Sequence, residues 1–106
     1  MTRPYERWHH LWGFFMTLDA QAPYDTDDEE ERMADELSGA PTAAVVAALA
    51  QWHEAFDNAD DEELERVAVD FTPSYDPTQK FGGYRQWAEW VREHLERELA
   101  ARSDKR

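Results

Sequence analysis

The sequence predicts an all-α fold, a small antiparallel bundle of about five helices. Apolar residues recur at spacings of three and four along most of the chain, and no segment alternates strictly between apolar and polar residues as a half-buried strand does. The connections between the helical segments are short, apart from one twelve-residue loop before the last helix. With 106 residues, the chain has the length of a single domain, 1–106, in which residues 102–106 are expected to form a frayed tail.

The first helix is predicted from Pro4 to about Leu18. Proline suits a first helical turn because the N–H group that it lacks would have no partner there. The apolar side chains at helical spacing are Tyr5, Trp8, Leu11, Trp12, Phe15 and Leu18. This mostly aromatic stripe indicates a helix that packs in the core.

Two further helices are predicted on either side of residues 38–41, because the glycine and proline in this segment interrupt a helix. A short acidic helix from Asp27 to Leu37 would turn Met33 and Leu37 inward. The next helix would run to about Phe56 with Thr42 as its N-cap, because a threonine hydroxyl can accept a bond from a free backbone N–H of the first turn. The inner stripe of this helix is predicted to contain Val46, Leu49, His53 and Phe56.

The fourth helix opens with Asp60-Asp61-Glu62-Glu63-Leu64, which has the pattern of a capping box. Asp60 can accept a hydrogen bond from the backbone N–H of Glu63, while the Glu63 side chain reaches back. The side chains that this helix would turn inward are Leu64, Val67, Ala68 and Phe71.

Residues Thr72 to Gly83 are predicted to form the long loop, because this stretch contains two prolines and two glycines. The last helix is predicted from Tyr84 to about Arg102, with Trp90 near the edge of the core. Its inner side chains would be Tyr84, Trp87, Val91, Leu95 and Leu99.

Composition indicates a cytoplasmic protein. The chain has no cysteine, so disulfides and thiolate zinc sites are excluded. No apolar run reaches the length that spans a membrane. The N-terminal stretch is aromatic but is broken by charged residues and histidines, so it lacks the plain apolar centre of a signal peptide.

The residues that carry chemistry do not form a catalytic or metal-binding pattern. None of the four histidines has the spacing that would place two metal ligands on one helical face. The acidic runs lack the alternating ligands and the central glycine of a calcium loop. No nucleophile motif is present. We therefore predict a non-enzyme without metal or cofactor.

Negative charge is concentrated in one part of the chain. Eighteen of the 24 acidic residues lie between Asp19 and Asp76, together with only Arg32 and Arg66, so this segment carries a formal charge of −16 within a total of −13. A concentrated acidic surface attracts cationic partners and repels phosphate backbones. The sequence therefore predicts a protein partner with a basic surface, and neither a nucleic acid nor a membrane.

Adaptation to a salty cytoplasm is an alternative cause of the acidity. It would scatter acids over every exposed face, whereas the last helix keeps arginines among its glutamates. These arginines are Arg85, Arg92, Arg97 and Arg102. Their presence favours a specific partner.

The segment Gly82-Gly83-Tyr84-Arg85-Gln86-Trp87 allows two interpretations. Tyr84 and Trp87 could lock the preceding loop onto the bundle. Alternatively, aromatic side chains exposed beside the acids could anchor a partner, as aromatic residues do in many interfaces. The candidates for such an anchor are Tyr75, Phe81, Tyr84 and Trp90.

The order of these features resembles the immunity proteins of bacterial contact-dependent growth inhibition and related polymorphic toxin systems. The resemblance covers roughly residues 11–99. It rests on the aromatic first helix, the acidic second helix, the Asp60–Leu64 helix start, the Tyr75-Asp76-Pro77 loop and the Gly83–Trp87 opening of the last helix. Ala88 stands where the family often has a leucine.

The resemblance implies a small non-catalytic inhibitor that binds the toxin domain of a neighbouring or sibling cell, frequently a nuclease. An acidic helical face could occupy the basic cleft of such a toxin. The residues predicted to contact the toxin are Tyr24, Asp25, Asp27, Asp28, Glu30, Glu31, Asp57, Asp60, Asp61, Glu62 and Tyr75. The alternative function is a helical adaptor or self-associating module that presents an aromatic groove.

Overall fold

A computed structural model of the chain describes residues 4–16, 29–71 and 78–103. Within these ranges it contains five helices of eight residues or more, two helices of four residues and no strand. The predicted all-α fold is therefore confirmed. The helices are α1 (Pro4–Arg7), α2 (His9–Met16), α3 (Glu29–Gly39), α4 (Thr42–Phe56), α5 (Asp61–Phe71), α6 (Thr78–Phe81) and α7 (Tyr84–Ser103).

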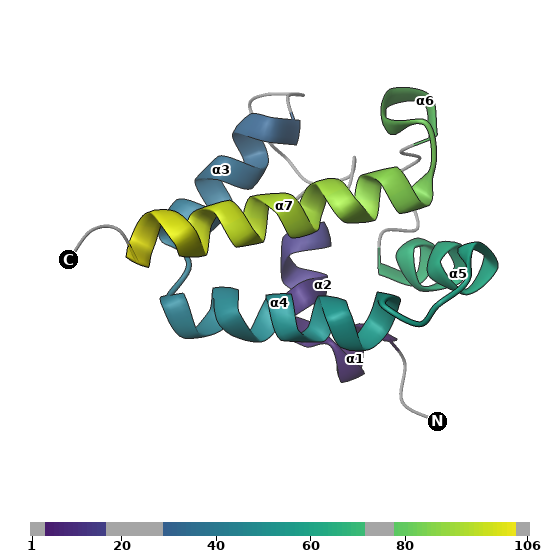
Figure 1. Ribbon diagram of the computed structural model, residues 1–106, viewed down its shortest axis with the longest axis horizontal. Helices are drawn as coiled ribbons and strands as arrows, with labels where there is room; N and C mark the ends of the chain where they lie inside the picture. The colour runs from purple at the N-terminus through teal and green to yellow at the C-terminus, as the bar shows by residue number, and fades with distance from the viewer. Residues whose placement is uncertain (1–3, 17–28, 72–77, 104–106) are drawn as a thin grey trace.

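Helices α4 and α7 form the centre of the bundle. They lie side by side and run in opposite directions, and α2 crosses behind them (Figure 1). Helix α5 packs beside the first half of α7 and α3 beside its second half. None of the helices in the described ranges is long and apolar enough to cross a lipid bilayer.

The ring of Phe15 on α2 is the hub of the core. Its centroid lies 4.7 Å from Trp87, 5.3 Å from Phe71 and 6.1 Å from Phe56, so one side chain connects four helices. The Trp87 and Phe56 rings meet it edge to face, an arrangement that aromatic quadrupoles favour. All four side chains are almost completely buried.

The first predicted helix is divided at Trp8, which lies in a turn between α1 and α2. The carbonyl of Trp8 still accepts a hydrogen bond from the N–H of Trp12, at 2.8 Å. Trp8, Leu11 and Phe15 are buried as predicted, and the structure adds Phe14 to the buried set. The predicted end at Leu18 lies outside the described residues.

Helix α3 buries Met33 and Leu37, as predicted, but it continues to Gly39. The predicted cap of α4 is wrong. The N-cap is Pro41, which makes no side-chain cap bond, and Thr42 is the first helical residue. The Thr42 hydroxyl instead accepts a bond from Arg102 Nη1 at 2.9 Å.

The predicted inner stripe of α4 is largely wrong. Phe56 is buried, but Val46 and His53 are exposed and Leu49 is only partly buried. The buried residues of α4 are Val45, Ala48, Trp52, Ala55 and Phe56. Trp52 fixes this orientation, because its indole N–H donates a buried hydrogen bond of 2.8 Å to the carbonyl of Ala88.

The predicted N-cap and inner side of α5 are confirmed, whereas Glu63 Oε1 lies 3.5 Å from Arg66. Asp60 Oδ1 accepts a bond of 2.8 Å from the backbone N–H of Glu63. The four predicted inner residues of this helix, Leu64, Val67, Ala68 and Phe71, are buried.

The loop predicted before the last helix contains a helical turn, α6. The N–H of Gly82 donates to the carbonyl of Thr78 at 3.1 Å, and Gly82 has a φ of +89°, a conformation that favours glycine. The ring of Phe81, at the end of α6, lies 5.2 Å from that of Trp90 on α7. Residues 72–77 of the predicted loop lie outside the described residues.

Helix α7 buries Trp87, Val91 and Leu95 as predicted, while Tyr84, Trp90 and Leu99 are partly buried. Ala88 and His94 are buried as well. Residue 102 was expected to begin a frayed tail, but it is well bonded in the last turn of α7. Arg102 Nη2 donates to the carbonyls of Leu37 (2.8 Å) and Ala40 (2.9 Å), which ties the end of α3 to α7.

Candidate protein-binding surface

Six of the predicted contact residues lie in the described part of the chain, and all six are exposed. They are Glu30, Glu31, Asp57, Asp60, Asp61 and Glu62. The other five, Tyr24, Asp25, Asp27, Asp28 and Tyr75, lie outside the described residues. The six form two groups, one in the first turn of α3 and one around the connection between α4 and α5.

Asp60 and Asp61 hold the α4–α5 connection together. Asp60 caps α5, as described above. The carboxylate of Asp61 accepts a hydrogen bond from Arg85 Nε, and Arg85 Nη2 donates to the carbonyl of Ala59 at 2.9 Å. Both residues therefore have a structural role, independent of any partner.

The Asp60 cap can be tested by replacement with alanine. We expect Asp60→Ala to lower the free energy of unfolding by about 0.5–2 kcal/mol, because the N–H of Glu63 loses its acceptor. Glu65→Ala, an exposed change later in the same helix, should stay within about 0.5 kcal/mol. Urea denaturation of both variants measures the difference, and equal stability would show that the cap contributes nothing.

Glu30 contacts a buried histidine that the sequence did not single out. Glu30 Oε1 lies 3.1 Å from Nε2 of His94, whose Nδ1 lies 3.0 Å from the carbonyl of Trp90. The pair joins α3 to α7 across 64 residues of sequence. His94 lies seven positions after Trp87 and three after Val91, so its helical position could have indicated burial.

Of the seven arginines in the described ranges, four are at least partly buried, whereas Arg7, Arg66 and Arg97 are exposed. Arg85 binds Asp61, and Arg92 lies over the ring of Trp52, with its guanidinium carbon 5.1 Å from the ring centroid. The side chains of Arg85, Arg92 and Arg102 are only 37%, 30% and 21% exposed. Arg32 is buried as well.

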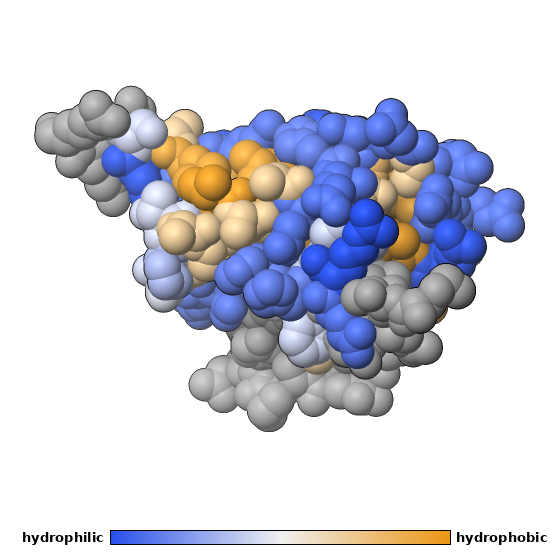
Figure 2. All heavy atoms as spheres, turned by 90° about the horizontal axis from the view of Figure 1, so that it is seen from below, coloured by the Kyte–Doolittle hydropathy of each residue, from blue (hydrophilic) through white to orange (hydrophobic). Residues whose placement is uncertain are grey.

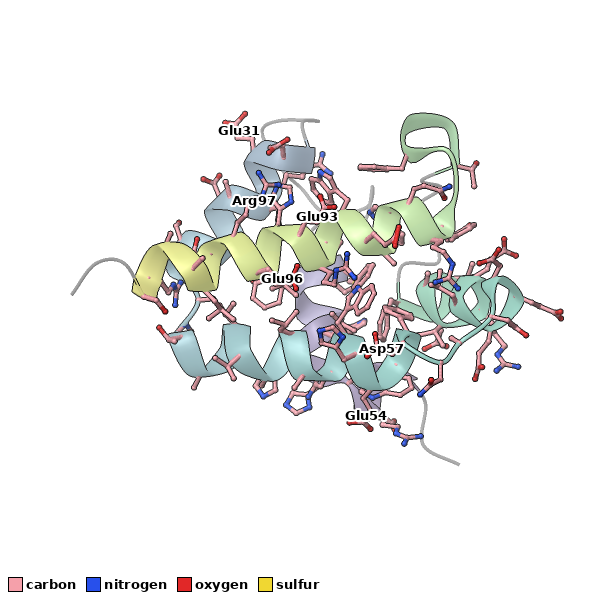
Figure 3. The ribbon with its side chains drawn as sticks, viewed as in Figure 1. Glu31, Glu54, Asp57, Glu93, Glu96 and Arg97 are labelled. Carbon is pink, nitrogen blue, oxygen red and sulfur yellow. The ribbon has the colours of Figure 1, made fainter. Side chains whose placement is uncertain are left out.

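The outward side of α7 carries glutamates. Glu93 and Glu96 are exposed and lie three residues apart, opposite the buried Trp87, Val91 and Leu95. In Figure 3 they lie between Glu31 of α3 and the end of α4. We define the acidic band as the exposed residues Glu31, Glu54, Asp57, Glu93 and Glu96. Arg97, which is also exposed, interrupts it between Glu31 and Glu93.

The acidic band contains two of the predicted contact residues, Glu31 and Asp57. Its other three members, Glu54, Glu93 and Glu96, were not predicted from the sequence. Three members of the acidic band have basic neighbours. Asp57 lies 3.0 Å from His53 Nδ1, Glu54 lies 3.4 Å from Arg7, and Glu96 lies 3.7 Å from Arg92 Nε. Exposed ion pairs of this kind are weak and leave the carboxylates accessible to a partner.

The aromatic residues beside the last loop mainly serve the core. Trp87 is completely buried, and the centroid of the Tyr84 ring lies 6.4 Å from it in an edge-on arrangement. Phe81 and Trp90 are partly buried and contact each other. This geometry gives the aromatic residues a structural role, in which the contact of Phe81 with Trp90 holds α6 against α7.

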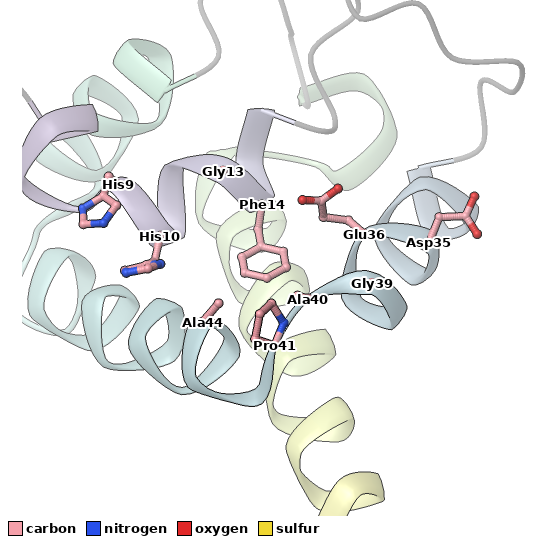
Figure 4. A pocket seen from close by; sticks show the side chains of 10 residues that line it. All are labelled: His9, His10, Gly13, Phe14, Asp35, Glu36, Gly39, Ala40, Pro41 and Ala44. Atoms are coloured by element: carbon pink, nitrogen blue, oxygen red, sulfur yellow. The ribbon is translucent and has the colours of Figure 1, made fainter.

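A hollow of about 380 Å³ lies between α2, α3 and α4. Its lining residues are His9, His10, Gly13, Phe14, Asp35, Glu36, Gly39, Ala40, Pro41 and Ala44 (Figure 4). Glu36 points toward the hollow and Asp35 points away from it. Across the described ranges, histidine and carboxylate side chains form no group of three that could hold a metal ion.

Comparison of the chain with protein-family models, with curated proteins and with solved structures found no match.

Proposed function

We propose that this chain is a cytoplasmic immunity protein that neutralises a cognate toxin domain by binding it, without catalysis. The toxin domain has a basic surface, as a nuclease that grips a phosphate backbone does. The acidic band competes with that backbone for the basic surface, and the inhibitor leaves the complex chemically unchanged. The order of sequence motifs described above supports the same class of function.

The observation that carries this proposal is the opposite placement of the two kinds of charge. Arg85, Arg92 and Arg102 are largely covered by partners inside the protein, while Glu93 and other carboxylates face solvent. The acidic band therefore presents five exposed carboxylates, interrupted by one exposed arginine, Arg97. A surface of one sign raises the association rate of an oppositely charged partner by about 10–10³-fold. Salt at physiological concentration screens this attraction beyond about 8 Å.

The proposal expects the toxin domain to be encoded in a neighbouring gene, and co-expression with that domain tests it. We expect the immunity protein to restore growth of cells that express the toxin domain, and a one-to-one complex to co-purify from them. A catalytically inactive toxin variant, which cells tolerate alone, supplies the complex for binding measurements. Cell death together with the absence of a complex would contradict the proposal.

A self-associating module is the second candidate function, and one observation favours it. Val46 is 50% exposed and belongs to an apolar stretch of α4, residues 43–50. Sedimentation of the isolated protein over a range of concentrations tests this candidate, because self-association would increase the mass with concentration.

A further inference from the structure

The first half of α4 is apolar on every side. Residues 43–50 contain only alanine, valine and leucine. One side of this segment is buried through Val45 and Ala48, whereas Ala43, Val46 and Ala50 on the other side are exposed. A helix that is apolar all round is normally buried. Figure 2 shows the resulting hydrophobic patch beside hydrophilic residues.

The outward face of α4 changes from apolar to acidic along its length. Ala43, Ala47, Ala50, Glu54 and Asp57 follow one another at spacings of four and three, so they lie along one face of the helix and its C-cap. At 1.5 Å per residue this stripe is about 21 Å long. Its first three residues are alanines, and its last two belong to the acidic band.

A shallow hollow extends the apolar end of the stripe toward α7. Val46 and the partly buried Leu99 line it together with Thr42, Arg102 and Ser103. Arg102 adds little free positive charge there, because its guanidinium also binds Glu98 at 2.7 Å. The hollow therefore suits an apolar side chain, while the far end of the stripe suits a cation.

We propose that the outward face of α4 docks an amphipathic basic helix on the surface of the toxin domain. This inference rests on the proposed function and specifies the recognised element. The alanines let a second helix approach closely, within the 8–10 Å axis separation of packed helices. Apolar side chains of the docked helix contact Val46 and the alanines, and its Lys or Arg side chains contact Glu54 and Asp57.

The charge of the chain favours this occupant over a second copy of the same chain. Two copies would each bring a net charge of −13 to the contact, whereas a basic helix complements it. The apolar part covers only about two helical turns. A stable dimer buries about 800 Å² on each partner, and a toxin domain can reach that area by extending over the acidic band.

Two exposed valines provide a matched test. Val46 is 50% exposed on α4, and Val69 is 41% exposed on α5. Each is replaced by glutamine, which is neutral and favours helix. Binding of an inactive variant of the adjacent-gene toxin domain is measured by surface plasmon resonance. We expect Val46→Gln to raise the dissociation rate about tenfold or more with an unchanged association rate, and Val69→Gln to change both rates less than twofold.

The outcomes separate this inference from the proposed function. Absence of binding by the unsubstituted protein would overturn both. Binding that is equal for the unsubstituted protein and both variants would overturn only the docking face on α4. Circular dichroism confirms that both variants keep their helices, and Ala50→Gln provides a second variant on the same face. Concentration-dependent dimerisation that Val46→Gln abolishes would assign the face to a second copy instead.

Discussion

Replacing Phe15 by alanine is expected to lower the free energy of unfolding by about 3–5 kcal/mol. The change removes the ring that connects α2 to Phe56, Phe71 and Trp87, and it leaves a cavity among side chains from three other helices. Domains of this size have a total stability of about 5–15 kcal/mol. The variant should therefore lose a large share of its stability, as guanidinium denaturation followed by tryptophan fluorescence can measure.

The same substitution at Phe81 is the control. Phe81 is only partly buried, and its ring contacts that of Trp90 near the edge of the core. We expect Phe81→Ala to cost clearly less than Phe15→Ala, because less apolar surface loses its cover. Equal losses at the two positions would show that Phe15 is not the hub of the core.

Most helices and much of the core could be predicted because polar and apolar residues separate cleanly in them. In α5, Leu64, Val67 and Phe71 are surrounded by charged residues, so one orientation buries the apolar side chains. In α4 the same rule failed. Apolar residues surround its first half, and periodicity there does not distinguish a stripe through Val46 from one through Val45. The long-range bond from Trp52 to Ala88 decides between them.

The acidic surface was predicted only in part because a charge count along the chain ignores direction. Arg92 and Glu93 cancel in such a count. Neighbouring residues on a helix point about 100° apart, and here Arg92 turns to the ring of Trp52 while Glu93 faces solvent. Outside the segment from Asp19 to Asp76 the chain has six acidic and nine basic residues, a net charge of +3, and this count concealed the glutamates of α7.

Long-range pairs were beyond the reach of sequence spacing for a different reason. Glu30 and His94 are 64 residues apart, and Asp61 and Arg85 are 24 apart. No local pattern encodes which acid meets which base across a bundle. The sequence therefore assigned Glu30 and Asp61 to a partner protein, although the structure gives both an internal contact.

Reversing the charge of three residues in the acidic band is expected to lower the rate of association with the toxin domain about tenfold or more at low salt. The substitutions are Glu31→Lys, Asp57→Lys and Glu93→Lys, which avoid the two aspartates that hold the α4–α5 connection. The association rate should also depend less on salt, because fewer charges steer the encounter. Stopped-flow measurements at several salt concentrations give both quantities.

A second triple variant distinguishes an effect of the acidic band itself from an effect of the net charge of the chain. Glu6→Lys, Asp35→Lys and Glu65→Lys change exposed acids outside the band and raise the formal charge of the chain by the same six units, from −13 to −7. If the band faces the toxin domain, this triple should slow association less than the first, since screening weakens the contribution of charges distant from the contact. Equal slowing by the two triples would assign the effect to net charge, and unchanged rates in both would exclude electrostatic steering. Only a larger effect of the first triple places the toxin domain against the face where α7 directs its glutamates outward.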